Sequence, residues 1–344
     1  MQAVILVAGK STRTYPLTLT RPKPLLKVAN RTILEHNLDN LNKIINEAII
    51  IVGYKKNQIK KHFKYKYKNI KLKYVEQKQQ LGTGHAASLA EPYIKDRFIL
   101  MAGDDIYSKE DIINCIRYRY SILTSKSDNP QNFGAILQKN GILADFVEKP
   151  KKFVSDLVNA SFYTFDKKIF AYLRQIKKSK RNEYELPDAI KLLSKDEKVF
   201  CVKSKQWLPI GYPWDLLKAD KILRKNKNSF GKNAKIMGEV TSSSIGDYSI
   251  VKGIVKNSIV MDGTVIDKNS IVEDSVIGSN VYFKGNAKSE DYTYSRINGK
   301  KIKVVRLGSI ISDNVKLNNI IINAGCKIWP NKSVSNKTIK EDLM

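Results

Sequence analysis

The sequence predicts an α/β domain with a mainly parallel sheet, followed by a left-handed parallel β-helix. Apolar strand-like runs alternate with helical segments up to about residue 210, and after a polar linker the apolar residues recur every six positions. Alternating strands and helices are typical of a parallel sheet covered on both faces. A six-residue period cannot stay on one face of a helix but suits the short sides of a β-helix coil. A chain of 344 residues is expected to form about two domains, which we place at residues 1–228 and 229–344.

The N-terminal elements follow one another in strand–helix order. Ala3–Ala8 is a continuous apolar run that ends at Gly9, as expected of a buried strand. The capping box Thr32-Ile-Leu-Glu35 predicts the start of a helix. Further strands are expected at Ala48–Val52, Leu72–Val75 and Phe98–Ala102, and further helices at Gly84–Ala90 and Trp214–Arg224. Because ligands bind at the carboxyl ends of parallel strands, the loops after Ala8, Val75 and Ala102 are expected to carry the functional site.

Three series of apolar residues support the β-helix. Their members lie six positions apart, and glycine, asparagine, aspartate and serine fill the gaps between them. The series are Ile259, Val265, Ile271, Ile277 and Phe283; Ile254, Val260, Ile266 and Val272; and Ile322, Ile328 and Val334. An ordinary β-sandwich is the alternative that this pattern disfavours.

The composition is strongly basic, with a net charge of +28 from 61 basic and 33 acidic residues. The densest stretch, Lys55–Lys73, holds nine lysines and no acid, yet only 11 of all the basic residues are arginine. Arginine supplies the bidentate fork that phosphate and base recognition favours, so nucleic acid is not expected as a partner. No apolar run approaches the ~18 residues of a membrane span. Three well-separated cysteines fit a reducing cytosol, so we expect a cytoplasmic protein without membrane association.

The loop after the first strand reads Gly9-Lys-Ser-Thr-Arg13. These letters suggest a P-loop, but that motif requires a glycine five residues before Gly9, where Val4 stands. The loop is instead a turn of small residues that ends at Arg13, with Lys23 ten positions further on. Backbone N–H groups in such a turn can bind phosphate oxygens, while a guanidinium and an ammonium group neutralise them.

The order of motifs along the chain resembles that of the sugar-1-phosphate nucleotidylyltransferases. Arg13 ends a turn similar to the family's Gly-x-Gly-Thr-Arg, and Pro16-Leu-Thr18 and Pro22-Lys-Pro-Leu25 follow it. The later motifs are Glu76–Ala86, Gly103-Asp104, Phe146–Pro150, Val158–Ala160 and Gly211–Asp215. The first of these resembles the base-binding segment of N-acetylglucosamine-1-phosphate uridylyltransferases, and the last a motif of archaeal-type members, to which glucose-1-phosphate thymidylyltransferases also belong. The resemblance implies a Rossmann-like nucleotidyltransferase domain before a hexapeptide-repeat β-helix.

The same resemblance implies roles for individual residues. Arg13 and Lys23 would be the catalytic cations that hold the β- and γ-phosphates, and Asp104 and Asp215 would bind Mg²⁺ between the nucleotide and the sugar phosphate. The nucleotide-binding residues would be Gly9, Lys10, Ser11, Thr12, Gln77, Gly82 and Thr83, and the sugar-phosphate-binding residues Gly134, Glu148, Lys149 and Asn159.

The implied reaction is attack of a sugar 1-phosphate oxygen on the α-phosphorus of a nucleoside triphosphate, which yields an NDP-sugar and pyrophosphate. The nucleophile is already an anion and needs no general base, so metal and cations would serve to bring two polyanions together. UTP and N-acetylglucosamine 1-phosphate are favoured by the resemblance. The alternatives dTTP and glucose 1-phosphate stay open, because Gln77 can pair with uracil or thymine.

Three positions depart from the family pattern. Ser11 stands at the usual second glycine of the first loop, Thr14 at a usual leucine, and Ser161 at the glycine of the sugar-binding strand. A Cβ at Ser11 could narrow the approach of phosphate, or its hydroxyl could add a donor. The departures leave rate and sugar choice open, but not the reaction class.

Two other functions stay open. Relatives with such a β-helix often also acetylate glucosamine 1-phosphate from acetyl-CoA, commonly with a histidine base. No histidine follows His85, and the segment Gly285–Lys300, where relatives place theirs, looks shortened. We therefore expect the β-helix mainly to assemble a homotrimer or a higher oligomer. The second alternative is a non-catalytic regulatory subunit, because exchange-factor subunits of eukaryotic translation initiation share both domain types; such a scaffold has no need of the catalytic and metal-binding residues named above.

Overall fold

The chain, described over residues Met1–Met344 by a computed structural model, forms two compact units. The first comprises Met1–Gly9 and Leu34–Pro209, and the second comprises Lys10–Ile33 and Ile210–Met344. The segment Lys10–Ile33 therefore belongs to the same unit as the C-terminal part of the chain. The domain boundary predicted from the sequence, between residues 228 and 229, divides the chain differently, because it was placed where the six-residue repeat begins.

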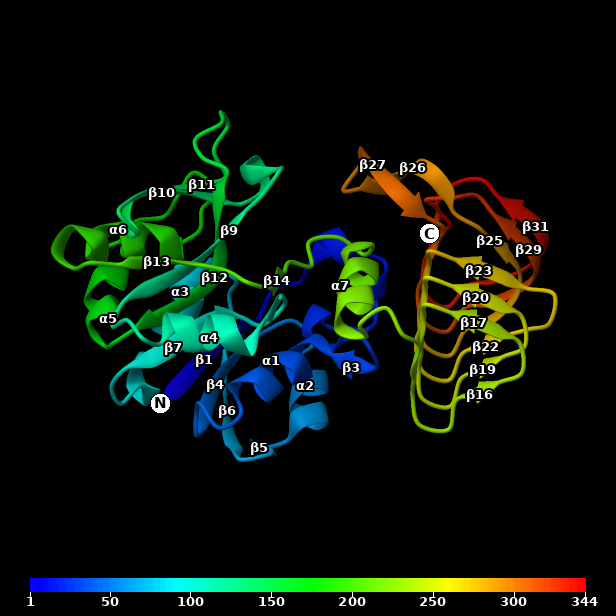
Figure 1. Ribbon diagram of the computed structural model, residues 1–344, viewed down its shortest axis with the longest axis horizontal. Helices are drawn as coiled ribbons and strands as arrows, with labels where there is room; N and C mark the ends of the chain where they lie inside the picture. Colours follow the sequence, from blue (N-terminus) through cyan, green and yellow to red (C-terminus); the bar gives the residue numbers. More distant parts are fainter. The chain divides into compact units, whose positions relative to one another are not determined.

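A ten-stranded sheet forms the centre of the first unit (Figure 1). In order across the sheet, its strands are β10 (Gly134–Lys139), β11 (Ile142–Glu148), β13 (Phe200–Lys203), β9 (Ser121–Lys126), β12 (Leu157–Phe165), β7 (Phe98–Ala102), β1 (Gln2–Val7), β4 (Glu47–Val52), β6 (Ile70–Glu76) and β5 (Lys66–Tyr67). A separate small sheet pairs β8 (Ile106–Tyr107) with β14 (Trp207–Leu208).

The large sheet has a parallel half and a mixed half. The neighbours β7, β1, β4 and β6 are parallel, which confirms the four strands predicted from the apolar runs. Beyond β7, strand β12 lies antiparallel to both β7 and β9, and β10 and β11 form an antiparallel pair. The parallel half sends its carboxyl ends into the three loops that were expected to carry the site.

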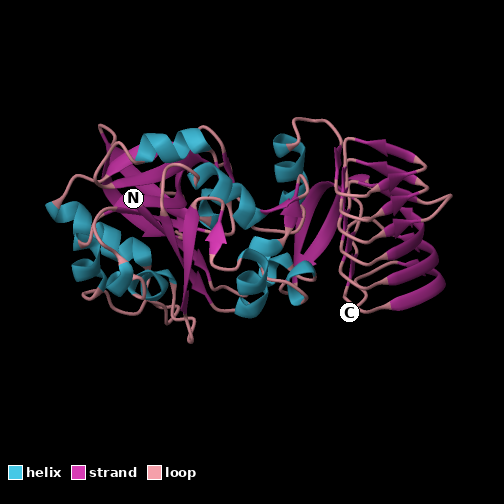
Figure 2. Ribbon diagram, turned by 90° about the horizontal axis from the view of Figure 1, so that it is seen from below, coloured by secondary structure: helices cyan, strands magenta, loops and turns pink.

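Helices cover both faces of this sheet (Figure 2). One face packs against α3 (Thr83–Ser88), α5 (Lys168–Leu173) and α6 (Leu186–Asp196), whose apolar side chains share one core with the strands. Strand residues that point to the other face, among them Ala3 and Ile5, are also fully buried. The other helical segments of the unit are α1 (Ile33–Leu41), α2 (Lys56–Phe63), α4 (Lys109–Cys115), η4 (Glu91–Tyr93) and η5 (Pro130–Asn132).

The second unit starts with short elements in the segment Lys10–Ile33. These are the 3-10 turns η1 (Thr12–Thr14), η2 (Leu17–Leu19) and η3 (Lys23–Leu25) and the paired strands β2 (Lys27–Val28) and β3 (Arg31–Thr32). Helix α7 (Asp215–Leu223) confirms the helix expected before the linker. Its buried Asp220 accepts hydrogen bonds from Ala29 N and Ser244 Oγ at 2.8 and 2.6 Å, so this carboxylate joins α7 to the segment and to the β-helix.

The rest of the second unit is a parallel β-helix, drawn as stacked coils in Figure 1. One side consists of β15 (Ser229–Phe230), β18 (Ser244–Ile245), β21 (Ile259–Val260), β24 (Val276–Ile277), β28 (Ile310–Ile311) and β30 (Lys327–Ile328). The other sides consist of β16 (Lys235–Ile236), β19 (Ile250–Val251), β22 (Val265–Ile266), β17 (Glu239–Thr241), β20 (Ile254–Lys256), β23 (Ile271–Glu273), β25 (Tyr282–Ala287), β29 (Lys316–Ile322) and β31 (Ser333–Ile339).

The predicted six-residue series lie on two different faces of these strands. Val260, Ile266 and Val272 are fully buried and point inward. Val265 and Ile271, one residue earlier in the chain, point outward and are only half-buried, because adjacent residues of a strand face opposite sides. Paired residues of successive coils are 15 or 17 positions apart, so the period of six cannot hold on all three sides.

A β-hairpin interrupts the β-helix between β25 and β28. Strands β26 (Glu290–Ile297) and β27 (Lys300–Leu307) pair antiparallel around Asn298 and Gly299, which both have positive φ. Such a two-residue turn is favoured in hairpins because its twist matches that of the strands. The segment Gly285–Lys300 is therefore largely an inserted hairpin and not the shortened coil that the sequence suggested.

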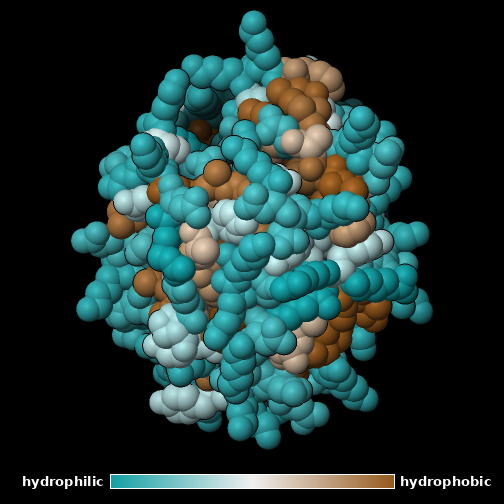
Figure 3. All heavy atoms as spheres, turned by 90° about the vertical axis from the view of Figure 1, so that its left-hand side faces the viewer, coloured by the Kyte–Doolittle hydropathy of each residue, from teal (hydrophilic) through white to brown (hydrophobic).

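The surface of the first unit is largely polar. None of the helices combines the length and the apolar composition that a membrane span requires. The face drawn in Figure 3 is mostly hydrophilic, with apolar atoms in separate patches. Seven of the nine lysines in Lys55–Lys73 are exposed to solvent.

Candidate active site

A pocket of about 360 Å³ opens in the first unit at the carboxyl ends of β1, β6 and β7. The loops after these three strands line it, together with the ends of β11 and β12 and the segment before α6. The predicted site residues in its wall are Gly9, Gln77, Gly82, Thr83, Asp104, Glu148, Lys149 and Asn159. The structure thus brings the expected base-binding and sugar-binding residues of this unit into one cavity.

Gln77, directly after β6, lines this pocket. Its Nε2 group donates to Gly82 O at 3.1 Å and contacts His85 Nδ1 at 3.1 Å, so only the amide oxygen is left as an acceptor. Gly82 has φ of +101°, and a Cβ there would lie 2.5 Å from Tyr184 O, so only glycine fits. A base with an N–H group on its edge, such as uracil or thymine, matches this acceptor.

Asp104 and Asp105 follow β7 but have different surroundings. The strand ends at Gly103, where a Cβ would lie 2.3 Å from Val7 Cγ1, and this close approach places Asp104 in the pocket wall. Asp105 accepts a hydrogen bond from Trp207 Nε1 at 3.1 Å, and its backbone oxygen accepts one from Asn37. Asp105 therefore joins helix α1 to strand β14, whereas Asp104 is the carboxylate in the pocket wall.

Glu148, at the end of β11, is a partly buried carboxylate among cations. Lys149 Nζ lies 3.9 Å and Arg181 Nη2 3.5 Å from its Oε1 atom. Arg181 is in turn held by Glu185 at 2.8 Å, and Ser179 Oγ donates to the same Glu185 oxygen at 2.9 Å. Burial raises the pKa of Glu148, and the charges of Lys149 and Arg181 offset only part of that shift.

Gly134 and Asn159 shape the pocket around Glu148. A Cβ at Gly134 would lie 2.8 Å from Glu148 Oε2, so this glycine leaves room for the carboxylate and is not itself part of the pocket wall. Asn159 donates through Nδ2 to Tyr163 Oη at 2.7 Å and accepts through Oδ1 from Ser161 N at 2.8 Å. Both partners fix the orientation of the Asn159 amide at the cavity.

Ser161 lies in an irregular part of β12, between Asn159 and Tyr163, where the pairing with β9 shifts register. Its φ is +56°, a left-handed conformation that glycine adopts without steric cost. Ser11 of the first loop is also left-handed, with φ of +52° and ψ of +54°. The two serines that replace family glycines thus both occupy positions where the backbone favours glycine.

We expect the substitution Ser161→Gly to stabilise the protein by about 0.5–1 kcal/mol. A non-glycine residue in the left-handed conformation destabilises the folded state by about 1–2 kcal/mol. Glycine removes this cost, but its greater freedom in the unfolded chain offsets about 0.4–1 kcal/mol of the gain. Urea denaturation would measure the difference. Ser125→Gly on β9, where φ is negative, is the matched control and should destabilise instead; equal effects of both substitutions would contradict the strain at Ser161.

The predicted phosphate-binding turn, Lys10–Arg13, lies in the second unit. Ser11 O accepts hydrogen bonds from Thr14 Oγ1 at 2.7 Å and Thr18 Oγ1 at 3.0 Å, which gives Thr14 a structural role that the usual leucine cannot have. The side chains of Lys10, Thr12 and Arg13 are exposed. The Arg13 guanidinium lies 5.6 Å from the centre of the Tyr212 ring, a cation–π distance that restrains it without using its N–H donors.

Lys23, which is buried, and Asp215, which is partly buried, are further charged residues of this half of the predicted site. The Lys23 side chain lies in η3 and is only 5% exposed. Asp215, the first residue of α7, accepts from Gly211 N at 2.8 Å and Tyr212 N at 2.7 Å, both through Oδ2. Burial raises the pKa of Asp215, while these N–H groups and the charge of Lys23 act in the opposite direction.

Asp104 of the first unit and Asp215 of the second are the ligands that the resemblance implies for a Mg²⁺ ion. Both are carboxylates, the oxygen donors that this hard cation prefers, and Asp215 keeps its Oδ1 atom without a hydrogen-bond partner. No group of three or more histidine, cysteine, aspartate or glutamate side chains is arranged as a metal site. Each carboxylate is by itself a suitable ligand type for Mg²⁺, which is usually held by one or two carboxylates together with water and substrate phosphates.

The sequence reasoning missed the contribution of the segment before α6. Arg181, Glu183 and Glu185 line the pocket, and Tyr184 anchors the segment by hydrogen bonds to Leu81 and Gly84 of the base loop. Neither the string Glu183-Tyr-Glu-Leu-Pro-Asp188 nor Arg181, two residues before it, shows a local pattern that predicts a binding role.

Comparison with known proteins agrees with this geometry. Residues 2–226 match the family model described as nucleotidyl transferase, which covers more than half of the chain. The chain belongs to the nucleotidyl transferase family. Residues 219–344 of this nucleotidyl transferase match the model described as GMPPB C-terminal domain.

Named relatives extend over both parts of this nucleotidyl transferase. The bifunctional protein GlmU of Methanococcus vannielii is 32% identical over 400 aligned positions, which cover 100% of this chain and 96% of that protein. The UTP–glucose-1-phosphate uridylyltransferase AglF of Haloferax volcanii is 33% identical over 236 positions, covering 65% of this chain and 97% of AglF. A crystal structure of UDP-glucose pyrophosphorylase with UDP-glucose has the same fold, with a TM-score of 0.60 at 22% identity over 66% of this chain and 99% of that one.

From these relatives, the chain is a sugar-1-phosphate nucleotidylyltransferase. They favour a catalytic function over the alternative of a non-catalytic regulatory subunit. The alignment with the Methanococcus protein runs over 400 positions, whereas this chain has 344 residues, so that relative contains segments without a counterpart here.

In this nucleotidyl transferase, the raised pKa of Glu148 predicts that the KM for the sugar phosphate increases as the pH is lowered. We call this increase the acid limb of the KM profile. Glu148 accepts hydroxyl hydrogen bonds fully only when ionised, so affinity should fall with decreasing pH, starting at a higher pH than an ordinary glutamate would give. Initial rates between pH 5 and 8 would show it. Glu148→Gln should raise the KM about 10-fold or more and abolish the limb, and Arg181→Gln should move it to higher pH. A limb that persists unchanged in Glu148→Gln would contradict the assignment.

Proposed function

We propose that this enzyme transfers a uridylyl group from UTP to N-acetylglucosamine 1-phosphate and releases pyrophosphate. The observation that carries the proposal is the single pocket in which Gln77, with its free amide oxygen, and the pair Glu148 and Asn159 line the same cavity. One end of such a cavity suits a pyrimidine edge, and the other suits sugar hydroxyls. A UDP-sugar joins these two groups through its two phosphates.

In the proposed reaction, an oxygen of the sugar 1-phosphate forms a bond to the α-phosphorus while the bond from that phosphorus to the β-phosphate bridge breaks. Pyrophosphate leaves with the electron pair. Lys149 of the first unit would neutralise the sugar phosphate, and Arg13 and Lys23 of the second unit would neutralise the departing phosphates. Since the nucleophile is anionic, the residues mainly position the groups and screen their charge.

We also propose that the reaction requires Mg²⁺, with Asp104 and Asp215 as its protein ligands. When bound, the ion would neutralise charge on the phosphates of both substrates. Asp104 offers its carboxylate at the pocket wall, and Asp215 offers the oxygen that the N–H groups of Gly211 and Tyr212 leave unused. Loss of pyrophosphate release on chelation, restored by added Mg²⁺, is the expected result.

The test of the function is pyrophosphate release with each pair of substrates. UTP, dUTP and dTTP would be combined with N-acetylglucosamine 1-phosphate and with glucose 1-phosphate. Comparison of dUTP with UTP isolates the 2′-hydroxyl, and comparison with dTTP isolates the base methyl group. The highest kcat/KM is expected for UTP with N-acetylglucosamine 1-phosphate, and no release with any pair from folded protein would overturn the proposal.

Acetyltransferase activity is the second candidate, because relatives such as the Methanococcus protein are named bifunctional. In this chain no histidine follows His85, and an inserted hairpin occupies residues 290–307. We expect no release of free CoA from acetyl-CoA with glucosamine 1-phosphate beyond the rate with N-acetylglucosamine 1-phosphate. A difference between the two acceptors would establish the second activity.

We propose a homotrimer formed by the β-helices. Outward-facing Ile250, Ile254, Val265 and Ile271 stay half-exposed on β19, β20, β22 and β23, and such aliphatic side chains favour burial against another copy. A mass of three times 39.1 kDa at micromolar concentration is expected. Ile254→Lys and Ile271→Lys should each lower the mass, whereas a monomeric wild type would refute the trimer.

A cytoplasmic location is proposed from the cysteines. Cys115, Cys201 and Cys326 all have free thiols, which suits a reducing compartment. Fractionation of source cells would test this location, whereas activity measured with and without a thiol reductant would not.

A further inference from the structure

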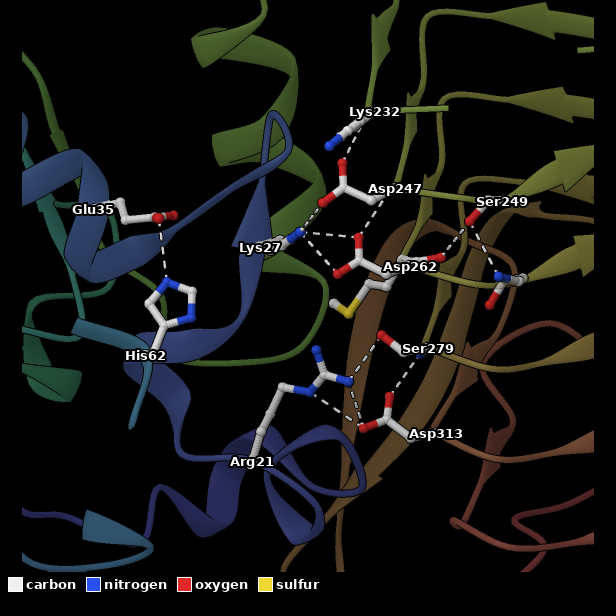
Figure 4. Close-up of polar contacts among 12 residues, drawn as sticks. Arg21, Lys27, Glu35, His62, Lys232, Asp247, Ser249, Asp262, Ser279 and Asp313 are labelled. Atoms are coloured by element: carbon white, nitrogen blue, oxygen red, sulfur yellow. Dashed lines mark hydrogen bonds and ion pairs between the residues drawn. The ribbon is translucent and has the colours of Figure 1, made fainter. Parts of the chain in front are cut away.

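We infer that one corner of the β-helix, formed by Asp247, Asp262, Ser279 and Asp313, positions Lys23 for the transferase reaction. We call these four residues the carboxylate corner. The inference rests on the proposed function, because it assigns the β-helix a part in triphosphate binding. All the residues involved lie in the second unit, and Figure 4 shows their contacts.

Arg21, two residues before Lys23, is bound to the C-terminal end of the carboxylate corner. Its Nη2 and Nε atoms donate to Asp313 Oδ2 at 2.6 and 3.2 Å, and Nη2 also donates to Ser279 Oγ at 2.9 Å (Figure 4). Thr20 Oγ1 donates to the same Asp313 oxygen at 2.5 Å. The side chains of Arg21 and Asp313 are only 18% and 8% exposed, so water competes little for this contact.

Lys27, four residues after Lys23, is bound to the other end of the carboxylate corner. Its Nζ atom lies 3.0 Å from Asp247 Oδ2 and 2.8 Å from Asp262 Oδ2, between two successive coils (Figure 4). The hydrogen bonds and charges of these two carboxylates outweigh burial and raise the pKa of Lys27. The Lys27 ammonium group is therefore charged at neutral pH.

The three carboxylates share one arrangement. In each, Oδ1 accepts from a backbone N–H of the preceding coil: Lys232 N to Asp247 at 2.7 Å, Asp247 N to Asp262 at 2.9 Å, and Ser279 N to Asp313 at 2.7 Å. The Oδ2 atoms contact the segment Lys10–Ile33, and Asp262 Oδ1 also accepts a hydrogen bond from Lys27 Nζ at 2.9 Å. Each aspartate thus binds both the coil stack and the segment, so the segment takes on the rigidity of the stack.

Lys23 lies between the two anchored residues. The chain from Arg21 to Lys27 contains the single turn η3, closed by Leu25 N to Pro22 O and Leu26 N to Lys23 O, both 2.9 Å. With both sides of this turn held, the Lys23 backbone has little freedom, and its ammonium group is presented in one place. A shift of about 1 Å in a group that binds reacting phosphates can cost about 100-fold in rate.

The test uses kinetic constants for each substrate separately. Asp313→Asn and Arg21→Gln should each raise the KM for UTP, lower kcat, or both, with a total loss of about 10- to 100-fold in kcat/KM for UTP. The KM for the sugar phosphate should change less than twofold, because its expected ligands lie in the first unit. The exchanged pair Arg21→Asp with Asp313→Arg should recover at least part of the loss, which a purely structural defect would not explain.

Asp267→Asn is the matched control. Asp267 also joins β-helix residues, accepting from Tyr282 Oη at 2.7 Å, but has no contact with the segment Lys10–Ile33. The substitution Asp267→Asn should leave the KM for UTP and the KM for the sugar phosphate unchanged. Wild-type kinetics in Asp313→Asn and Arg21→Gln, or equal losses in Asp267→Asn, would overturn the inference.

Hydrogen exchange separates this inference from the proposed function. Peptides covering residues 10–33 should exchange faster in Asp313→Asn than in wild type and Asp267→Asn, whatever reaction the enzyme catalyses. Faster exchange in an enzyme that releases no pyrophosphate would refute the proposed function alone. Unchanged exchange in an active enzyme would refute the positioning role alone.

Discussion

Replacing Lys23 by methionine is expected to lower kcat/KM for pyrophosphate release by about 10²–10³-fold, the usual cost of removing one charge-stabilising group from a reacting centre. Methionine has a similar length and packs in apolar surroundings, so the 5% exposed site can accept it without a cavity. The loss would therefore report the missing charge. Initial rates of pyrophosphate release at saturating sugar phosphate would measure it.

Lys235→Met is the control for this experiment. Lys235 is exposed on β16 in the same unit, and its replacement removes the same charge without touching the segment around Lys23. Its kinetic constants should equal those of the wild type. Full activity of Lys23→Met would remove this lysine from the catalytic residues.

Replacing Asp104 by asparagine is expected to abolish measurable pyrophosphate release at ordinary Mg²⁺ concentrations, with a loss of about 10²–10³-fold or more. Asparagine keeps the shape of the side chain but removes the charge that a divalent cation requires. If Asp104 is a ligand, higher Mg²⁺ should recover part of the activity. Rates measured over a range of Mg²⁺ concentrations would separate lost metal binding from misfolding.

The adjacent Asp105 is the control that the structure offers. Because Asp105 accepts from Trp207 Nε1 in the small sheet region, Asp105→Asn should lower the free energy of unfolding by about 0.5–1.5 kcal/mol and retain most activity. The reverse result, with Asp105→Asn inactive and Asp104→Asn active, would exchange the roles of the two residues.

The parallel half of the sheet could be predicted because it is buried on both faces. Strands such as β1 and β4 are then continuous apolar runs that stand out in the sequence. The mixed half could not be predicted in the same way. Strand β10 ends in three exposed residues and β11 has only partly buried ends, and their places in the sheet depend on pairing with β12 and β13, which are more distant in the chain.

The β-helix could be predicted as an architecture but not in its register. Aliphatic residues occupy adjacent positions such as Ile259 and Val260, so both faces of a strand give a period of six. The outward members on β21, β24 and β28 are also buried, which the sequence does not distinguish from the inward core. The hairpin of β26 and β27 also carried no signal except the Asn298-Gly299 turn.

The site could be predicted where motifs are local. Gln77, Asp104 and Glu148 each lie beside a strand end and were found from short strings of residues. Contacts that join distant segments could not be predicted, because no local sequence pattern indicates them. Arg21 and Asp313 are 292 positions apart, and neither is unusual in its own neighbourhood.

The contact between Arg21 and Asp313 also sets an order of events during synthesis. The ribosome adds about 5–20 residues per second, so Arg21 leaves it roughly 15 to 60 s before its partner exists. For most of that interval the segment Lys10–Ile33 also lacks Asp247 and Asp262, the partners of Lys27, which lie 220 and 235 positions after it. The first functional loop to be translated is thus among the last to acquire its final shape, and a nascent chain stopped near residue 228 would contain the motifs of the transferase without the support for its lysine.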